Sequence, residues 1–421
     1  MKTKIIIILV MLFSALRAQN NEWLVFKPLN SGLPDNIINA VTFNVNEVWI
    51  GTPQGLSEYN NNQWTVYNTT NSLLQNNFIR CVAIDNTAKR WVGTPDGVVS
   101  IDNGPSQKGW NVYNSSNSGL PLNNITTIAV DNNNNKFFGT WGAGLAVLND
   151  GEWAIYNMSN SPLPANGIYD IKVDINNNVW IATYGGGLAK FDGSNWQVYN
   201  ASNSNLPSDI VYAIGFDGQS NIWLGTESGL VKFDGNNQWR LFDSHNTGWD
   251  FTSVLCVKVD ELNNKVYFGT YNGMGIYSEN NFTFKKTNNS GLSNNWVSAI
   301  NIDTFGNKWI GTLGGGISIY NENGVKVSVE NFLKSQNKYA LICYPNPVNS
   351  KVQLIINLPE ASKVIFKIYD ITGKECKSLS KENSIRGINS FFLNIEDMPS
   401  GLYYCTVETL FGRQTTKLII T

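Results

Sequence analysis

Side chains capable of acid–base or metal chemistry are sparse in this sequence. It contains one histidine, His245, in Asp-Ser-His-Asn-Thr-Gly, with no second histidine or cysteine pair beside it. A histidine-rich zinc site is therefore not expected, and a Ser-His-Asp triad would depend on this single residue. We interpret His245 as a polar loop residue, and we predict no catalytic residue, no metal site and no cofactor.

Three tryptophans indicate a different kind of chemistry, because they stand outside any regular spacing. Of the 14 tryptophans, 11 recur in two periodic series described below, which leaves Trp141, Trp249 and Trp296. Aromatic rings offer flat contact area at little cost in conformational entropy, and Asn and Asp around them can supply hydrogen bonds. These residue types suit a neutral sugar or a peptide. The alternative is that the three rings cap repeat packing or are scattered over the surface.

The elements that must position these residues come from a repeat of roughly 43 residues. Each unit contains an aromatic residue, an apolar one, Gly-Thr or Ala-Thr, a tight turn and then Gly. The aromatic residues of this phrase are Trp49, Trp91, Phe137, Trp180, Trp223, Tyr267 and Trp309. A second series lies 21 residues before the polar residue that closes a short apolar strand, and its members are Trp23, Trp64, Trp110, Trp153, Trp196, Trp239 and Phe282. A period of about 40–45 residues with several short strands is typical of a β-propeller blade.

The strand pattern also predicts how the propeller closes. Residues 168–200 show four β-rich runs separated by Asn, Asp and Gly, which favour turns. Seven sets of the first three strands follow one another, whereas the fourth-strand pattern already begins at Trp23. We predict an all-β, seven-bladed propeller over residues 19–324 whose N-terminal strand completes the last blade and removes two exposed sheet edges. Closure through a strand starting at Val325 is the alternative.

In a four-stranded meander, the hairpin between the second and third strands and the loop into the first strand emerge on one face. Six aromatic residues outside the two periodic series fall at these connections or at the start of a first strand. They are Trp141, Tyr184 and Tyr271 in hairpins, Trp249 and Trp296 in loops, and Tyr169 at a strand start. We predict that these six residues form a ligand-binding face.

The repeat phrases also resemble a known family. Trp-Ile-Gly-Thr at 309–312 with Gly-Gly-Gly-Ile at 314–317, and Trp-Leu-Gly-Thr at 223–226 with Gly-Leu at 229–230, are similar to the two-component regulator propeller repeat, over about residues 22–324. The resemblance implies a sensing propeller outside the cytoplasm. Because the family's repeat residues are structural, they specify architecture rather than ligand.

The composition changes near Tyr344, where short alternating strands and tight turns predict a small immunoglobulin-like β-sandwich over residues 344–421. Its ordered motifs resemble the type A C-terminal sorting domain of the type IX secretion system over about residues 340–421. The matching residues are Pro345, Asn346, Pro347, Asp370, Gly373, Lys374, Gly401, Tyr403 and Lys417. The resemblance implies contact with the secretion machinery, export across an outer membrane, and removal of this domain at a linker over residues 325–343. An ordinary immunoglobulin-like binding module is the alternative.

The N-terminus and the charge balance limit location and partners. Residues 1–18 combine a charged start, an apolar run and a final alanine, which predicts a signal peptide. The run is too short to span a bilayer, and we expect no membrane span in the mature chain. Residues 19–337 carry 25 acidic and 17 basic side chains, which argues against nucleic acid and strongly anionic polymers. Among five cysteines, we expect Cys81 and Cys256 to be small core residues, while Cys376 and Cys405 could pair.

These observations favour an exported binding module, either released or displayed on the cell surface, with a glycan or protein as ligand. An extracellular polysaccharide lyase is the catalytic alternative. It would need a base and a charge stabiliser at the channel mouth, such as Tyr184 or Tyr169 with Lys172 or Arg80. A structural adhesin or scaffold is the third possibility.

Overall fold

The computed structural model describes residues 22–44, 47–60, 63–102, 109–325, 341–344, 346, 348, 350–358, 360–384 and 387–420. The predicted signal peptide, residues 326–340 of the predicted linker, Pro345 and Pro347 lie outside these residues.

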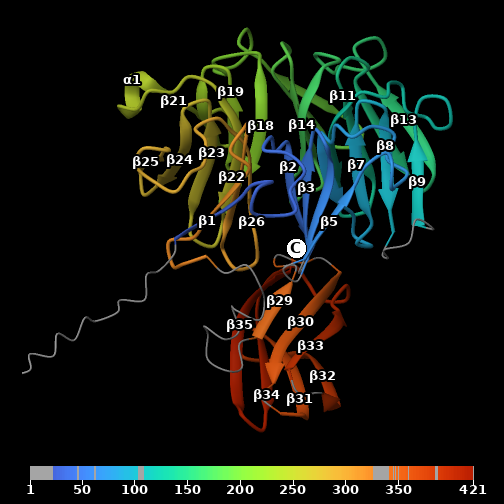
Figure 1. Cartoon of the computed structure of the whole chain (residues 1–421), viewed down its shortest axis with the longest axis vertical. Helices are drawn as coiled ribbons and strands as arrows, with labels where there is room; N and C mark the ends of the chain where they lie inside the picture. The colour runs from blue at the N-terminus through green and yellow to red at the C-terminus, as the bar shows by residue number, and fades with distance from the viewer. Residues whose placement is uncertain are drawn as a thin grey trace, which may run out of the picture.

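Seven four-stranded antiparallel sheets form the blades of a propeller in the described residues up to 325 (Figure 1). The first four blades are β2 (Ala40–Asn44), β3 (Glu47–Thr52), β4 (Gly55–Asn60) and β5 (Gln63–Tyr67); β6 (Cys81–Ile84), β7 (Arg90–Thr94), β8 (Gly97–Ile101) and β9 (Trp110–Tyr113); β10 (Ile125–Val130), β11 (Lys136–Thr140), β12 (Leu145–Asn149) and β13 (Glu152–Tyr156); and β14 (Ile168–Val173), β15 (Val179–Thr183), β16 (Leu188–Phe191) and β17 (Trp196–Tyr199). The last three are β18 (Val211–Phe216), β19 (Ile222–Thr226), β20 (Gly229–Phe233) and β21 (Trp239–Phe242); β22 (Val254–Asp260), β23 (Lys265–Thr270), β24 (Gly273–Ser278) and β25 (Asn281–Lys285); and β26 (Val297–Ile302), β27 (Lys308–Thr312), β28 (Ile317–Tyr320) and β1 (Trp23–Phe26). A single helical turn, α1 (Ser244–Thr247), is the one helix of the described residues.

The first strand of every blade lines the axis. β2, β6, β10, β14, β18, β22 and β26 each contact the next, and β26 returns to β2. The apolar residues that alternate along these strands, such as Ile171 and Ile214, are fully buried between blades. The remaining side chains therefore face the axial channel, because successive side chains of a strand point to opposite faces.

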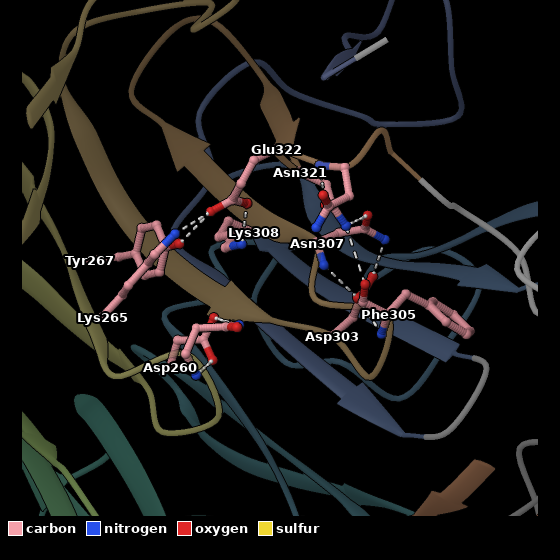
Figure 2. A network of polar contacts seen from close by, with 11 residues as sticks. Asp260, Lys265, Tyr267, Asp303, Phe305, Asn307, Lys308, Asn321 and Glu322 are labelled. Carbon is pink, nitrogen blue, oxygen red and sulfur yellow. Dashed lines mark hydrogen bonds and ion pairs between the residues drawn. The ribbon is translucent and has the colours of Figure 1, made fainter. Parts of the chain in front are cut away.

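The N-terminal strand closes the ring, as predicted. β1 pairs with β28, with Trp23 opposite Tyr320 and the two rings stacked 4.6 Å apart. Val325 packs on the core of the first blade without forming a strand. A polar network seals the same region (Figure 2): Glu322 binds Lys265 and Lys308, and Asn321 donates a hydrogen bond to Asn307.

The periodic aromatic residues and threonines are structural. In four blades the tryptophan on the second strand donates its indole N–H to the aspartate that closes the first strand, as in Trp180 to Asp174 at 2.8 Å; the other pairs are Trp91–Asp85, Trp223–Asp217 and Trp309–Asp303. The threonine of each Gly-Thr or Ala-Thr donates its hydroxyl to the carbonyl of the glycine that follows the turn, as in Thr183 to Gly187 at 2.8 Å. The same bond occurs at Thr52, Thr94, Thr140, Thr226, Thr270 and Thr312.

The C-terminal region is a two-sheet sandwich with its own core. One sheet contains β29 (Leu341–Tyr344), β30 (Lys351–Leu358) and β33 (Gly387–Asn394), and the other contains β31 (Ser362–Asp370), β32 (Glu375–Ser384), β34 (Gly401–Thr409) and β35 (Gly412–Ile420). β29 begins three residues before the predicted domain boundary at 344. Val352, Phe366 and Val407 are among the residues buried between the sheets.

The sorting-motif residues shape turns and edges of this sandwich. The Asn346 amide donates to the Lys417 carbonyl and accepts from the Ile419 N–H, both at 2.8 Å. Asp370 accepts hydrogen bonds from Thr372 and from the Lys374 N–H in a turn where Gly373 has a φ of 85°. The Tyr403 hydroxyl donates to the Pro399 carbonyl at 2.8 Å, beside Gly401 at the start of β34.

All five cysteines are free, so Cys376 and Cys405, whose pairing the sequence left open, are not bonded to each other. Cys376 is exposed, whereas Cys405 is buried in the sandwich core together with Cys343. Cys81 and Cys256 pack against blade cores, as expected for small apolar residues.

Candidate functional site

The channel mouth is built by a repeated irregularity of the inner strands. In five blades the pairing of the first strand with the second skips one residue, and the skipped residues are Thr126, Tyr169, Tyr212, Leu255 and Ser298. Such bulges at a sheet rim redirect a side chain. Asn39 and Arg80 hold the equivalent position in the first two blades. These seven residues form the ring that we call the mouth.

Aromatic residues from adjacent blades meet at this mouth. Trp141 lies 5.6 Å from Tyr169 and 5.7 Å from Tyr184, measured between ring centroids. Tyr169 in turn lies 5.7 Å from Tyr184 and 4.9 Å from Tyr212. These four residues, contributed by the third, fourth and fifth blades, form one continuous aromatic surface.

A second pair extends this surface around the ring. Tyr271 and Trp296 lie 4.9 Å apart in an edge-to-face arrangement. Burial, and then the Tyr271 phenol, raise the pKa of Tyr212. We call these six residues, Trp141, Tyr169, Tyr184, Tyr212, Tyr271 and Trp296, the aromatic rim.

The aromatic rim is exposed to solvent although it consists of large rings. Trp141 is 44% exposed, Tyr184 53%, Tyr271 49% and Trp296 43%. Ile37 and Phe78 are also exposed, and they occupy the loop position of Trp296 in the first and second blades. Contiguous exposed apolar surface of this kind marks binding sites more often than isolated apolar residues do.

Trp249, which was predicted on the same face as Trp141 and Trp296, does not join the aromatic rim. Its ring packs 4.9 Å from Phe284 and lines a separate cavity of about 380 Å³ between β21, α1 and the β24–β25 hairpin. Trp249 stands five residues before Val254, the first residue of β22. The same position in the other six blades holds a buried leucine: Leu33, Leu74, Leu120, Leu163, Leu206 and Leu292. Trp249 is therefore part of the repeat.

Tyr212 was missed by sequence reasoning, although a signal for it was present. It follows Tyr169 by 43 residues, which is the length of one blade, and so it occupies the same bulge position. The same spacing links Trp141 to Tyr184, and Tyr184 to the exposed Glu227. Aligning the sequence by blade rather than by residue type would have identified the whole rim.

The side of the mouth facing the second and third blades is polar and incompletely satisfied. Arg80 Nε and Thr126 Oγ1 are buried atoms without a hydrogen-bond partner, and so is Asn124 Oδ1 beside them in sequence. Native proteins pair the large majority of such atoms, so orphaned ones require an explanation. A bound ligand group is one such explanation.

Tyr169 and Lys172, which were considered as base and charge stabiliser of a lyase, have protonation and pairing that do not favour these roles. Burial, and then the neighbouring phenols of Tyr212 and Tyr184, raise the pKa of Tyr169 to about 12, so its hydroxyl stays protonated at neutral pH. Lys172 forms an ion pair with Asp170 at 3.0 Å. Asp170 also accepts the Ile214 N–H at 3.0 Å, which ties two neighbouring blades together.

The remaining candidates for chemistry lie elsewhere. His245 is on the exposed turn α1, with its Nδ1 3.5 Å from the Asp243 carboxylate. Within the described residues, His, Cys, Asp and Glu side chains do not gather into any group of three that could hold a metal ion. In the same part of the chain, none of the helices is long and apolar enough to cross a membrane.

Two family models match segments of the chain. Residues 342–421 match the secretion system C-terminal sorting domain, and residues 162–185 match the two component regulator propeller. The second match contains Tyr169 and Tyr184 of the aromatic rim. The sorting domain indicates that the chain is exported to the cell surface or the extracellular space. A search of curated proteins found no match.

Solved structures share the fold at low sequence identity. The extracellular domain of the hybrid two component system BT3049 from B. thetaiotaomicron has a TM-score of 0.62 and 17% identity, covering 95% of this chain and 57% of that one. PorZ, a surface component of the type-IX secretion system of Porphyromonas gingivalis, has a TM-score of 0.59 and 16% identity, covering 93% and 60%. Virginiamycin B lyase from Staphylococcus aureus has a TM-score of 0.56 and 14% identity, covering 70% and 97%. The chain thus spans under two thirds of the length of the first two proteins, and all three likenesses concern the fold alone.

Proposed function

We propose that this exported propeller, with its regulator-type repeat and C-terminal sorting domain, is a non-catalytic module whose aromatic rim binds an extracellular carbohydrate. One observation carries the proposal. Six rings from five consecutive blades converge on the mouth, and four of them are between 43% and 53% exposed. Sugar rings present flat C–H faces, which pack on such side chains at little cost in conformational entropy.

The polar groups beside the rings support a sugar over a purely apolar ligand. Thr126 Oγ1 and Asn124 Oδ1 have unused hydrogen-bonding capacity, and sugar hydroxyls both donate and accept. The raised pKa of Tyr169 favours a hydroxyl that donates hydrogen bonds to a ligand over one that removes a proton from it.

The test is binding of soluble oligosaccharides to the full chain, followed by tryptophan fluorescence. The Trp141→Ala and Trp296→Ala variants should lose the saturable change, whereas Trp249→Leu should keep it, because that residue lies outside the rim. Retention of full affinity in both rim variants would refute the assignment of the site. Shortened sugar products in the same samples would instead show that the protein is an enzyme.

A further inference from the structure

The mouth has two chemically different halves. Its residues from the fourth, fifth and sixth blades are Tyr169, Tyr212 and Leu255, whereas those from the seventh, first, second and third are Ser298, Asn39, Arg80 and Thr126. Ser298 donates to the Ile38 carbonyl, and Asn39 donates to the Ile79 carbonyl, so these two side chains are engaged by neighbouring blades. Arg80 and Thr126 keep unused polar atoms, Nε and Oγ1.

The charge of Arg80 has no acidic partner among the described residues. Its guanidinium lies 5.5 Å from the centre of the exposed Phe78 ring, and burial lowers its pKa. A half-buried arginine whose Nε is fully buried costs free energy unless another group compensates its charge.

Other charged side chains lie on the inner strands below the mouth, and these have partners of opposite charge. In β14 and β22 they are Asp170, Lys172, Lys258 and Asp260. Lys172 and Asp170 form an ion pair, and the carboxylates of Glu261 and Asp260 act electrostatically on Lys258. Arg80 therefore differs from these lysines, although acidic side chains outnumber basic ones by 25 to 17 over residues 19–337.

We propose that the carbohydrate bound at the aromatic rim carries a carboxylate, and that Arg80 binds this carboxylate at the mouth. The proposal rests on the function proposed above and adds the class of ligand: an oligosaccharide with a uronic acid unit at or near its end. The sugar ring packs on Tyr169 and Tyr212, while the carboxylate accepts charge-assisted hydrogen bonds from the guanidinium of Arg80, which is partly exposed.

A single acidic unit fits this site better than a polyanion. The mildly acidic propeller repels a chain charged along its whole length, whereas one carboxylate can pair with Arg80 at the mouth. Glu227 is an acidic residue close enough to the aromatic rim to help burial raise the pKa of Tyr212. Its side chain is exposed, so water screens its repulsion more than it screens the charge of the half-buried Arg80.

The experiment compares three versions of one β-linked disaccharide on the full chain. One ends in glucuronate, the second is its methyl ester, and the third is its carboxyl-reduced neutral counterpart. We expect the acid to bind on the order of tenfold to a hundredfold more tightly than the other two. Arg80→Gln should abolish that preference, and Lys258→Gln should reduce it by a smaller factor. The charge-matched control is Lys190→Gln on β16, which should leave the preference unchanged.

Each alternative result has a distinct meaning. Equal affinity for all three sugars, or a preference that survives Arg80→Gln, would overturn this inference and leave the carbohydrate site standing. Failure of every sugar to bind would overturn the proposed carbohydrate-binding function. Binding of a peptide through its terminal carboxylate would then identify a peptide as the ligand. If Arg80→Gln does not fold, Arg80→Lys keeps the charge without the planar fork, and it should retain only part of the preference.

Discussion

Lys308 Nζ lies 2.6 Å from Glu322 Oε2, and this ion pair secures the blade that the two ends of the propeller share. The Lys308 side chain is 3% exposed, while Glu322 is 31% exposed and also binds Lys265 at 2.9 Å and the Tyr267 hydroxyl at 3.2 Å (Figure 2). Lys308 lies on β27, and Glu322 follows β28, the strand that pairs with β1. A buried lysine depends on its partner, because an unpaired buried charge is strongly destabilising.

Glu322→Gln should therefore lower the free energy of unfolding by roughly 2 kcal/mol at neutral pH. Burial alone would raise the pKa of Glu322, but hydrogen bonds from Lys308 and Lys265 hold it at about 2, below its usual 4.5. Because the folded-state pKa is lowered, the stabilisation is complete above pH about 4.5 and is lost as the pH falls from there toward 2. Urea unfolding of both proteins across this range measures the effect.

The exposed Glu152→Gln provides the control and should show almost no change at any pH. A difference between wild type and Glu322→Gln that stays constant from pH 7 to pH 2 would contradict the assigned role of the ion pair.

Trp249→Leu restores the residue found at this position in the other six blades. We expect the free energy of unfolding to fall by less than about 1.5 kcal/mol, because the Trp249 ring is only half-buried and leucine keeps an apolar contact with the same core. Leu120→Ala at the equivalent buried position should cost about 2–5 kcal/mol through the cavity it leaves. A cost for Trp249→Leu as large as that of Leu120→Ala would show that the tryptophan is an essential core residue.

Gly187→Ala should be among the most damaging single changes in the fourth blade. Gly187 has a φ of 84°, and an added Cβ would lie 2.2 Å from the Tyr199 carbonyl oxygen. Backbone strain and the clash together should cost about 2–5 kcal/mol, measurable as a fall in the melting temperature. Gly185→Ala separates the two causes, because its φ of 88° is similar but its Cβ would meet nothing within 4 Å. Equal losses of stability at the two positions would show that the clash with the Tyr199 carbonyl is not the main cause of the destabilisation.

Asn346→Ala should weaken the sorting domain by releasing β35. It removes the two 2.8 Å hydrogen bonds to Lys417 and Ile419, for an expected loss of about 1–3 kcal/mol. We expect less protein to reach the cell surface or medium, with a lower unfolding midpoint of the full chain's C-terminal transition. The exposed Thr415→Ala, on the same strand, should secrete normally. Normal secretion of the Asn346→Ala variant would contradict this prediction, because it would show that secretion does not depend on the anchoring of β35 by Asn346.

The sequence by itself determined the repeat architecture of this protein. The 21-residue interval from Trp23 to Asn44 and its counterparts predicted seven blades, because six of the blades are local units whose hydrogen bonds lie within about 43 residues. The same interval predicted the strand that closes the seventh blade, because Trp23 follows the fourth-strand pattern although its partner strand ends at Tyr320. Pairs such as Trp180 and Asp174 are six residues apart, so the periodicity reveals them directly. The ordered motifs of the C-terminal region could also be recognised from the sequence, because they form turns and strand edges.

The tertiary structure decided which side chains share the mouth. Tyr169 and Tyr212 are 43 residues apart and meet because their blades are neighbours in a closed ring, with a bulge in each inner strand at that position. Trp249 has the same residue type as Trp141 but fills a leucine position between blades. Whether Arg80 finds an acidic partner depends on distances across the channel, which strand periodicity does not specify. The local pattern thus fixes the elements, and packing between blades assembles the site.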